Sequence, residues 1–535
     1  MAGAIASDGP PIDAGGGGGS GSSSTGATAP RASLADWLAV AAGTIGALMA
    51  TLDISIVNSS LPTIQGEIGA TGTEGNWIAT AFLVAEIVII PMAAWFQRLL
   101  GMRTFLLISA SLFTGFSVMC GLSDSLNMMI IGRVGQGFTG GALIPTAQTI
   151  IATRLPRDQQ PVGIAMFGVT AIMGPVIGPL VGGWLTENVS WHYAFFINLP
   201  IGALLIILLL IGLPHERSNM DELREADWLG VAGLALGLGG LTVMLEDGQR
   251  EQWFASSLIW WMAITAVIGF ALLLMGQRTA RRPVIKLSLL LDRQFGSVAL
   301  MAVVLGVVLY GTAYVIPQFL AAIADYNALQ SGEIVLLAGI PSLVMMAMVP
   351  ILLRTIDIRL AVAAGLAIMG ASALIDAHLT IDSVGGDFVH SQLLRGIGQI
   401  LGMLFLSQAA IQSVPAKDAG DASGLFNAMR NLGGSLALAG IAIVQDQRLW
   451  FHSRRLEESL NANSLAVQER VADLTQLLGT EPTALRLLAR QIEGQALVMT
   501  YNDIFLLMGI GTLLILPLVL FLRPLPKTMS AGAMH

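Results

Sequence analysis

Residues 130–151 read IIGRVGQGFTGGALIPTAQTII, an apolar run that is long enough to cross a bilayer as a helix and yet contains an arginine, Arg133. A second apolar run, residues 394–406, reads LRGIGQILGMLFL and contains Arg395. In both runs, small residues and a glutamine follow the arginine, and a short turn with a proline and an aspartate comes next. Because an arginine inside a membrane span is rare, this similarity predicts two parallel copies of one unit. The alternative is a chance similarity between apolar segments.

The composition is that of a polytopic membrane protein. Of 535 residues, 12% are charged, against about 25% in soluble proteins. Apolar residues make up 54%, and the mean hydropathy is +0.73. These values exclude a soluble enzyme and a disordered scaffold, and a net charge of -8 argues against a nucleic-acid partner. The single cysteine excludes a disulfide framework and a cysteine-based metal site.

Fourteen apolar runs are long enough to span a bilayer core about 30 Å thick. They lie near residues 36–60, 75–97, 103–122, 126–151, 162–186, 193–213, 226–246, 255–276, 295–318, 333–353, 357–378, 388–411, 424–444 and 501–522. If the N-terminus is cytoplasmic, the basic residues concentrate in the cytoplasmic segments, and the short outer loops hold only Arg250. The charge distribution therefore supports fourteen spans and predicts a multi-pass protein of the cell inner membrane with both termini cytoplasmic.

The span count and the repeat divide the chain into four parts. Residues 1–33 form a Gly/Ser-rich cytoplasmic tail, which lacks the pattern of a signal peptide. Residues 34–213 form the N-terminal six-helix half, residues 214–294 a linker with two extra transmembrane helices, and residues 295–525 the C-terminal six-helix half. We therefore expect an all-α polytopic membrane protein of 14 helices, in which two parallel halves surround a midplane cavity.

One outer loop, residues 445–500, is much longer than the others. Its sequence places leucines at the three-and-four spacing of amphipathic helices. The loop is either a solvated helical cap or a docking surface for a second protein outside the membrane.

Two acids lie inside predicted spans, where a charge costs about 2.5–3.5 kcal/mol at the helix centre. Asp53 lies late in the first span, and Glu86 lies among apolar neighbours at the middle of the second span. A carboxylate beside a cavity can take up and release a proton, so both are candidate proton carriers. The structural alternatives are a helix-capping Asp53 and a Glu86 that stays protonated in a hydrogen bond.

Arg133 and Arg395 keep their charge in proteins, so each needs a carboxylate or backbone carbonyl groups as partners. We expect Arg133 to take part in proton coupling with Asp53 and Glu86. A fixed pair between helices is the structural alternative. Two secondary candidates are Asp376, near the outer end of the eleventh span, and Arg430, early in the thirteenth.

The predicted substrate cavity is lined by Asp53, Glu86, Gln136, Arg395 and Asn427. We expect no cofactor and no metal, with protons as the coupling ion. No cluster of acids or histidines typical of a membrane-embedded enzyme is evident in the sequence, and a GxxxxGK[ST] motif for ATP does not occur. The sequence thus indicates a secondary active transporter.

The fifth predicted span has an unusual pattern, GVTAIMGPVIGPLVGGWL at residues 168–185. Its glycines allow close approach of a neighbouring backbone, and its prolines remove helix hydrogen bonds. We expect a bent helix that seals the cavity at the seam between the halves and bends as they rock. The residues of this element are Gly174, Pro175, Gly178, Pro179, Gly182 and Gly183.

Three stretches carry a family resemblance that covers nearly all of residues 34–525. LDISIVNSSLP at 52–62 resembles the LDxTIVNVALP signature of the fourteen-span drug:proton antiporters of the major facilitator superfamily, the EmrB/QacA type. GRVGQGFTGGALIP is similar to the RxxQGxGxA element of that family, and GPVIGPLVGG is similar to its antiporter element GPxxGPxxGG. The resemblance implies the major facilitator fold, an export activity and a proton-coupling role for Asp53.

The loop after the second span departs from the superfamily pattern. Where the family usually reads GxLADRxGRR, residues 94–103 read AWFQRLLGMR, and Arg98 occupies the position of the aspartate. An acid-based lock at this loop is therefore in doubt. The long loop 445–500 resembles that of the EmrB branch, which implies a periplasmic adaptor and an outer-membrane channel as partners.

We predict an antiporter that uses the proton gradient to export hydrophobic or amphipathic toxic compounds. One proton moving inward across roughly 100 mV and one pH unit yields about 3.7 kcal/mol, enough for a several-hundred-fold concentration ratio. The alternatives are an exporter of one metabolite, such as a fatty acid or an aromatic acid, and an uptake carrier for a nutrient.

Overall fold

The computed structural model describes residues 32–216, 218–219, 223, 225–280, 282–459 and 465–523, all of them within one unit, Ala32–His535. Most of the predicted tail 1–33 lies outside the described residues. The first helix begins where the side chain of Ser33 accepts a hydrogen bond from the amide of Asp36 and the Asp36 carboxylate accepts one from the amide of Ser33. It ends at Gly69, whose φ of 72° lies in the left-handed region that favours glycine.

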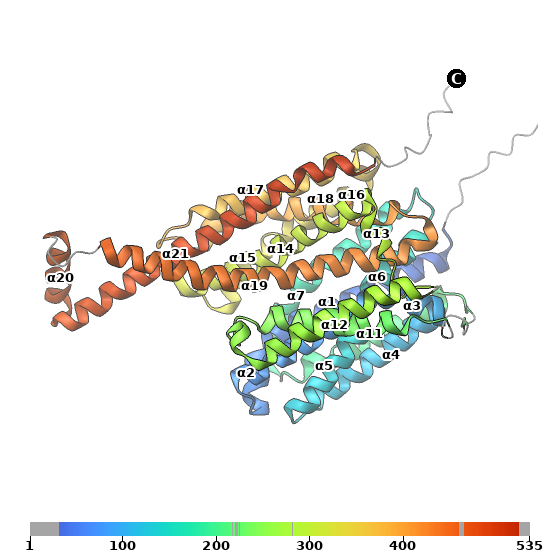
Figure 1. Cartoon of the computed structure of the whole chain (residues 1–535), viewed down its shortest axis with the longest axis horizontal. Helices are drawn as coiled ribbons and strands as arrows, with labels where there is room; N and C mark the ends of the chain where they lie inside the picture. The colour runs from blue at the N-terminus through green and yellow to red at the C-terminus, as the bar shows by residue number, and fades with distance from the viewer. Residues whose placement is uncertain are drawn as a thin grey trace, which may run out of the picture. The chain divides into compact units, whose positions relative to one another are not determined.

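The described residues are almost entirely helical, with no strand among them (Figure 1). The first half of the chain contains α1 (Leu34–Ile68), α2 (Gly72–Gly75), α3 (Trp77–Leu100), α4 (Met102–Gly121), α5 (Leu126–Gly140), α6 (Leu143–Arg154), α7 (Gln160–Asn188), α8 (Tyr193–Phe196) and α9 (Asn198–Gly212). Between the halves lie α11 (Trp228–Asp247), η1 (Trp253–Ala255) and α12 (Ser257–Thr279). The second half contains α13 (Ser288–Leu291), α14 (Arg293–Ile323), α15 (Ala328–Leu336), α16 (Gly339–Thr355), α17 (Ile358–Ile375), η2 (Asp376–His378), η3 (Gly385–Phe388), α18 (Val389–Gln412), η4 (Ala416–Asp418), α19 (Ala419–Ser459), α20 (Leu465–Leu478), α21 (Glu481–Leu514) and η5 (Leu516–Phe521).

The helices agree with a polytopic membrane protein. Within the described ranges, 11 helices are long and apolar enough to cross a bilayer. The three other predicted spans also coincide with helices: the fourth with α5 and α6, the fifth with α7, and the thirteenth with α19. The prediction of an all-α polytopic protein is confirmed, while the number fourteen stays a prediction.

The two halves repeat one pattern of helix neighbours. In the first half α1 packs on α7 and α9, and α4 packs on α5 and α9. In the second half α14 packs on α19 and α21, and α17 packs on α18 and α21. Each contact joins the helices that the sequence repeat makes equivalent, which supports two copies of one unit.

The inserted pair is attached through one of its members. Helix α11 packs on α12, on α3 of the first half and on α19 of the second half. The two inserted helices approach closely because a side chain at Gly233, Gly237 or Gly269 would meet the backbone of the partner helix. On α12, tryptophans Trp260 and Trp261 are exposed, as expected for a surface in contact with lipid.

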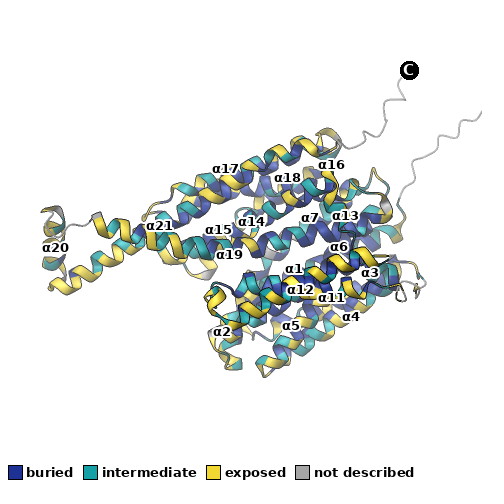
Figure 2. Cartoon of the chain, in the orientation of Figure 1, coloured by how far each residue is buried: buried dark blue, intermediate teal, exposed yellow. Residues whose placement is uncertain are grey.

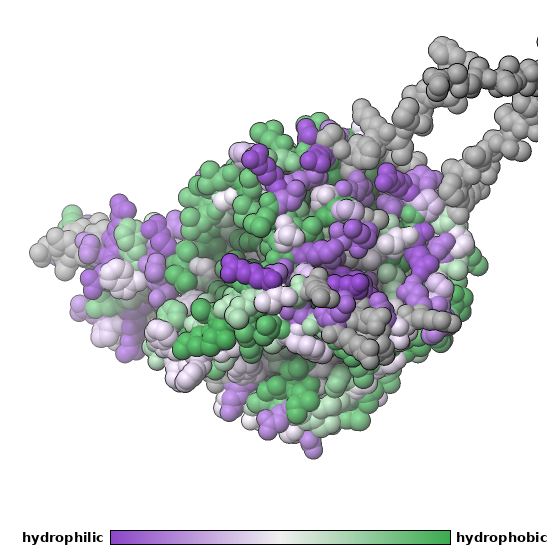
Figure 3. Space-filling model, turned by 45° about the vertical axis from the view of Figure 1, so that its right-hand side comes forward, coloured by the Kyte–Doolittle hydropathy of each residue, from purple (hydrophilic) through white to green (hydrophobic). Residues whose placement is uncertain are grey.

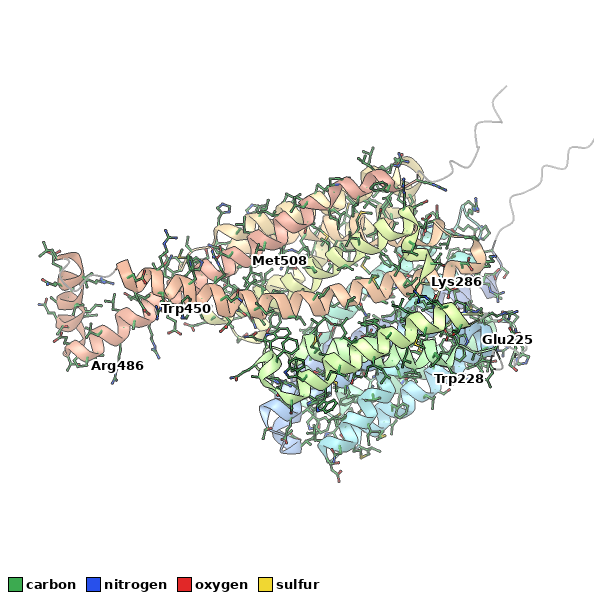
Figure 4. The ribbon with its side chains drawn as sticks, viewed as in Figure 1. Glu225, Trp228, Lys286, Trp450, Arg486 and Met508 are labelled. Carbon is green, nitrogen blue, oxygen red and sulfur yellow. The ribbon has the colours of Figure 1, made fainter. Side chains whose placement is uncertain are left out.

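The loop predicted at 445–500 is mostly helical where the structure describes it, at residues 445–459 and 465–500, in agreement with its leucine spacing. Helix α19 continues to Ser459, α20 packs on α21, and α21 begins at Glu481 (Figure 1). We call α19 from residue 445, α20 and α21 up to residue 500 the projection. Trp450 and Arg486 lie on it, whereas Glu225 and Lys286 lie at the other end of the helices (Figure 4). We call these two ends the projection face and the opposite face.

The surface is divided in the way that a bilayer requires. Exposed residues are frequent along the projection, and buried residues line the middle of the long helices (Figure 2). Hydrophilic residues gather on the opposite face, which comes forward in Figure 3, and hydrophobic residues cover much of the flanking surface. Polar ends with an apolar belt between them fit a protein that crosses the membrane.

Candidate functional site

Asp53 lies at the centre of a polar cluster inside the first half. Its carboxylate is fully buried and accepts a hydrogen bond from Arg133 Nη1 at 2.5 Å. Its other oxygen accepts bonds from Gln136 Nε2 at 3.0 Å and from Asn198 Nδ2 at 2.7 Å. The four side chains come from α1, α5 and α9, so the pair joins three helices of one half.

The rest of the Arg133 guanidinium is also satisfied. Its Nε donates to the carbonyl of Ile78 at 3.1 Å, and the guanidinium lies 4.2 Å from the centre of the Phe82 ring. Nη1 donates to Gln136 Oε1 at 3.1 Å as well. Removing one partner of a buried pair leaves an uncompensated charge, which typically costs about 3–5 kcal/mol. Breaking the contact between Asp53 and Arg133 without compensation is therefore costly.

Asn198 is a member of this cluster that sequence reasoning missed. It is fully buried, donates to Asp53 and to Ser117, and its own side-chain oxygen has no hydrogen-bond partner. The available signal was the asparagine of FFINLP, a polar residue at the start of a strongly apolar helix. The Oδ1 atom of Asn198 is therefore free to accept a hydrogen bond from a further donor beside the Asp53 carboxylate.

A second buried pair lies in the second half. Arg395 Nη2 donates to Asp376 at 2.6 Å, and Arg395 Nη1 donates to Gln392 at 2.8 Å. Both charged side chains are at most 4% exposed. Because α18 supplies Arg395 and η2 supplies Asp376, this pair lies within one half and does not join Glu86 or Asp53.

Glu86 faces the second half of the molecule. It is 4% exposed, and the charge that acts on it most strongly is that of Arg430 on α19, ahead of Arg133. Tyr310 on α14 belongs to the same group, since the charges of Arg430 and Glu86 both act on it. The hydroxyl of Tyr310 and Nη2 of Arg430 each donate to Asn431 at 3.2 Å. We call Glu86, Arg430, Tyr310 and Asn431 the central group; it brings both halves together.

The fourth predicted span is interrupted beside Glu86. Helix α5 ends at Gly140 and α6 starts at Leu143, with a turn between them. Pro145 cannot donate a hydrogen bond to the carbonyl of Gly141, and its ring would clash with that carbonyl in a continuous helix. A side chain at Gly141 would meet Glu86 at 2.8 Å, so the glycine lets the broken helix approach the acid.

The halves close against each other toward the opposite face. Gln148 Oε1 accepts hydrogen bonds from Ser423 Oγ at 2.6 Å and from Asn427 Nδ2 at 2.9 Å. The structure thus places Asn427 in a fully buried contact between the halves. Nearby, Gln148 borders a cavity of only about 20 Å³, which is close to the volume that one water needs.

Two ion pairs lie at this closed end. Arg98, at the position where an aspartate was expected, donates to Asp421 at 3.2 Å across the halves. Lys286 pairs with Asp418, which lies in η4 directly before α19, the helix that carries Asp421. The contact at this loop therefore does contain an acid, Asp421, but the acid lies in the second half. The first half supplies the positive charge, Arg98, where the family pattern has an aspartate.

The glycines of α7 pack inside their own half. A side chain at Gly174, Gly178 or Gly182 would meet Thr51, Ser55 or Ser59 of α1. The helix runs without a break through Pro175 and Pro179, and Gly183 has no neighbour within 4 Å. In the second half α7 packs on α15, α16 and α18, and Gly168 faces Met346 and Leu404 there. Helix α7 thus contacts both α1 and the second half, and its glycines at 174, 178 and 182 pack it against α1. Its role in sealing the cavity and bending stays a prediction.

Among the residues that the structure describes, no group of three or more His, Cys, Asp or Glu side chains could hold a metal ion. The charged side chains instead form pairs and clusters within and between helices.

Comparison with known proteins extends over most of the chain. The chain is 33% identical to the colistin resistance protein EmrB of Acinetobacter baumannii, over 89% of this chain and 94% of that protein. It is 31% identical to the multidrug export protein EmrB of Escherichia coli, over 90% and 94%. The fatty acid resistance protein FarB of Neisseria gonorrhoeae is 28% identical, over 91% and 96%.

Solved structures support the fold. The human organic anion transporter MFSD10 superposes with a TM-score of 0.59 at 15% identity, covering 89% of this chain and 99% of that one. Residues 43–438 match the Major Facilitator Superfamily. The chain therefore belongs to the Major Facilitator Superfamily and is a membrane transporter rather than an enzyme.

Proposed function

We propose that this transporter exports hydrophobic and amphipathic toxic compounds from the cell in exchange for protons. The names of the relatives support drug export, since two of them are colistin resistance and multidrug export proteins. The apolar composition of the helices and the few buried acids suit lipophilic compounds, including cationic ones.

The observation that carries the proposal is the position of Glu86 in the central group. A carboxylate buried between the halves, with Arg430 on the far side, changes its interaction with cargo when it gains or loses a proton. In the ionised form Glu86 attracts a cationic or hydrogen-bonding cargo. After protonation it loses that attraction, and the cargo is released on the proton-rich side.

The Asp53 cluster couples this step to the arrangement of the first half. Asp53 holds α1, α5 and α9 together only while Arg133, Gln136 and Asn198 donate to it. A proton on Asp53 removes the ionic part of this contact and frees the Arg133 guanidinium. In the proposal this loosens the three helices and favours rocking of the halves.

The chain is proposed to lie in the inner membrane with both termini cytoplasmic. The distribution of basic residues supports this orientation, with the opposite face in the cytoplasm. The contacts from Gln148 to Ser423 and from Arg98 to Asp421 then correspond to a state closed toward the cytoplasm. The projection extends into the periplasm, where its helices suit an adaptor protein that leads to an outer-membrane channel.

The test is ethidium export in inverted membrane vesicles energised with a proton gradient. We expect the variants Glu86→Gln and Asp53→Asn to lose uncoupler-sensitive export. The matched control is Glu187→Gln, an exposed acid near the end of α7, which should keep it. Export by Glu86→Gln at the control rate, still stopped by an uncoupler, would contradict the proposed role.

A fatty-acid exporter is the second candidate. The relative FarB is named for fatty acid resistance, and Arg430 has an unpartnered Nε in the central group, which could hold a carboxylate. Competition between laurate and ethidium in the same vesicles separates the two. Laurate export that depends on Arg430 and leaves ethidium untransported would favour this candidate.

A further inference from the structure

An open cavity of about 330 Å³ lies on the projection face, away from the central group. It is lined by Gln249, Tyr314, Ala442, Gln445, Asp446, Leu449 and Leu497. These residues come from the end of α11 and from α14, α19 and α21. The volume is within the range of sites for small molecules, and the lining combines one aromatic ring, two amides and one carboxylate.

Glu246 lies one helical turn inward from this cavity. It precedes Gln249 by three residues, at the end of the inserted helix α11. Its carboxylate accepts a hydrogen bond from Ser435 Oγ of α19 at 2.7 Å. The acid therefore sits at the contact between the inserted helix and the second half, below the cavity.

Two tyrosines on α14 connect the same two levels. Tyr314 lines the cavity, and Tyr310, four residues earlier, lies on the same side of the helix one turn inward. Each tyrosine residue is 41% exposed, and Tyr310 feels the charge of Arg430 first and those of Glu86 and Glu246 after it. A side chain at Gly434 would meet the Tyr310 ring at 2.6 Å, so the glycine leaves room for it. The rings thus form an aromatic wall that leads from the central group to the cavity.

The charges around the outer end of this wall are acidic, whereas Arg430 lies at its inner end, beside Tyr310. Asp446 lies in the lining and Glu246 below it, and the lining contains no lysine or arginine. The cations nearest to the cavity itself are already paired: Arg250 binds Asp247 at 2.6 Å, and Arg448 binds Asp503 at 2.5 Å. Acids together with exposed aromatic faces attract organic cations, because both the carboxylates and the ring faces favour positive charge.

We propose that this cavity is an outer subsite for organic cations, with Glu246 and the Tyr310–Tyr314 wall as its recognition elements. It rests on the proposed export function and adds a station through which cationic cargo passes after it leaves the central group. Neutral and anionic compounds lack the charge that Glu246 and Asp446 recognise and do not depend on it.

The chain itself offers a direct readout of occupancy. Its one cysteine, Cys120, is buried. A Gln249→Cys variant of the full chain therefore carries a thiol in the cavity that can be labelled with N-ethylmaleimide. We expect tetraphenylphosphonium to slow this labelling at least fivefold, and laurate to leave it unchanged.

The recognition is tested by adding Glu246→Gln to the Gln249→Cys chain. The tetraphenylphosphonium concentration that gives half-maximal protection should rise at least tenfold. The control Glu333→Gln, which changes an exposed acid on α15, should leave this concentration unchanged. A second variant, Tyr314→Ala, should weaken protection severalfold, and Tyr314→Phe should retain most of it. Equal protection in Glu246→Gln and Glu333→Gln would overturn the proposal.

The same chains separate this inference from the proposed function. Loss of uncoupler-sensitive ethidium export in Glu86→Gln, with no cation protection at residue 249, would refute the subsite and leave the antiporter standing. Protection that depends on Glu246, with export in Glu86→Gln that runs at the control rate and is still stopped by an uncoupler, would support the subsite and refute the proposed role of Glu86 in proton coupling.

Discussion

At the scale of single residues, the Asp53 cluster depends on an asymmetry between its two charges. An aspartate left without its arginine can become neutral by binding a proton, whereas an arginine left without its aspartate remains charged. The fully buried position of both side chains makes this difference large.

We predict that Asp53→Asn lowers the thermal stability of the purified protein more than Arg133→Gln does. The aspartate variant leaves a buried charge, which typically costs about 3–5 kcal/mol. The double variant should recover part of the stability but not the export activity. Thermal unfolding of the three variants in one detergent checks this order, and equal losses in the two single variants would contradict it.

Sequence reasoning reached the charged members of the sites and the neutral residues Gln136 and Asn427, but not Asn198 or Gln148. Asp53, Arg133 and Glu86 stand out because a charge in an apolar run is conspicuous. Asn198 and Gln148 are uncharged and give no periodic signal, so their roles emerge only when helices distant in sequence meet. Glu246 was also missed, because it lies at the end of its span, where an acid usually faces water.

At the scale of helices, the glycines of α7 separate into two kinds. Gly178 leaves no room for a side chain because it faces Ser55 of α1, whereas Gly183 faces open space. The sequence pattern treats both as one element, and the packing partner distinguishes them.

We predict that Gly178→Ala destabilises the protein by about 1–3 kcal/mol, since an added methyl group forces α1 and α7 apart. Gly183→Ala is the matched control, and we expect it to leave stability and ethidium export near the original values. Thermal unfolding and vesicle transport of the two variants check this. A larger loss in Gly183→Ala would show that close packing on α1 is not what these glycines provide.

The ends of the helices were harder to predict than their presence. The thirteenth predicted span, 424–444, belongs to α19, which continues to Ser459. Hydropathy marks only the part of a helix that contacts lipid. It gives no signal for where the polar helical turns of the projection end. The contact between Arg448 and Asp503 that joins α19 to α21 is likewise a pairing across 55 residues.

At the scale of the whole transporter, the closed end is held by contacts that span the two halves. Arg98 and Asp421 are 323 residues apart, and Arg98 remains 35% exposed. A pair of this exposure contributes about 0.2–1 kcal/mol, which changes the ratio of closed to open states by a factor of up to about five.

We predict that Asp421→Asn increases labelling of a Gln408→Cys thiol, which lies beside the small cavity at the closed end. Exchange of both charges, Arg98→Asp with Asp421→Arg, should restore the original labelling rate. Arg157→Gln, an exposed arginine on the same face, is the control and should leave the rate unchanged. If the exchanged pair labels as fast as Asp421→Asn, the ion pair does not hold the closed state.

The family resemblance correctly indicated the fold and the transporter class, although its three motifs all lie in the first half, at residues 52–62, 132–145 and 174–183. It could not indicate the ion pair between Arg98 and Asp421, because a motif describes a single loop. This ion pair joins residues from two different halves. The neighbour pattern of the halves, by contrast, follows from the arginine repeat at Arg133 and Arg395.

The contacts of α11 with both α3 and α19 have a pharmacological consequence. If the halves rock as proposed, at least one of these two surfaces must slide, and the bond from Ser435 to Glu246 crosses one of them. A small molecule bound between α11 and α19 would block the conformational change without competing with cargo for Glu86. Inhibitors of that kind would retain potency against variants that widen or reshape the cargo pocket.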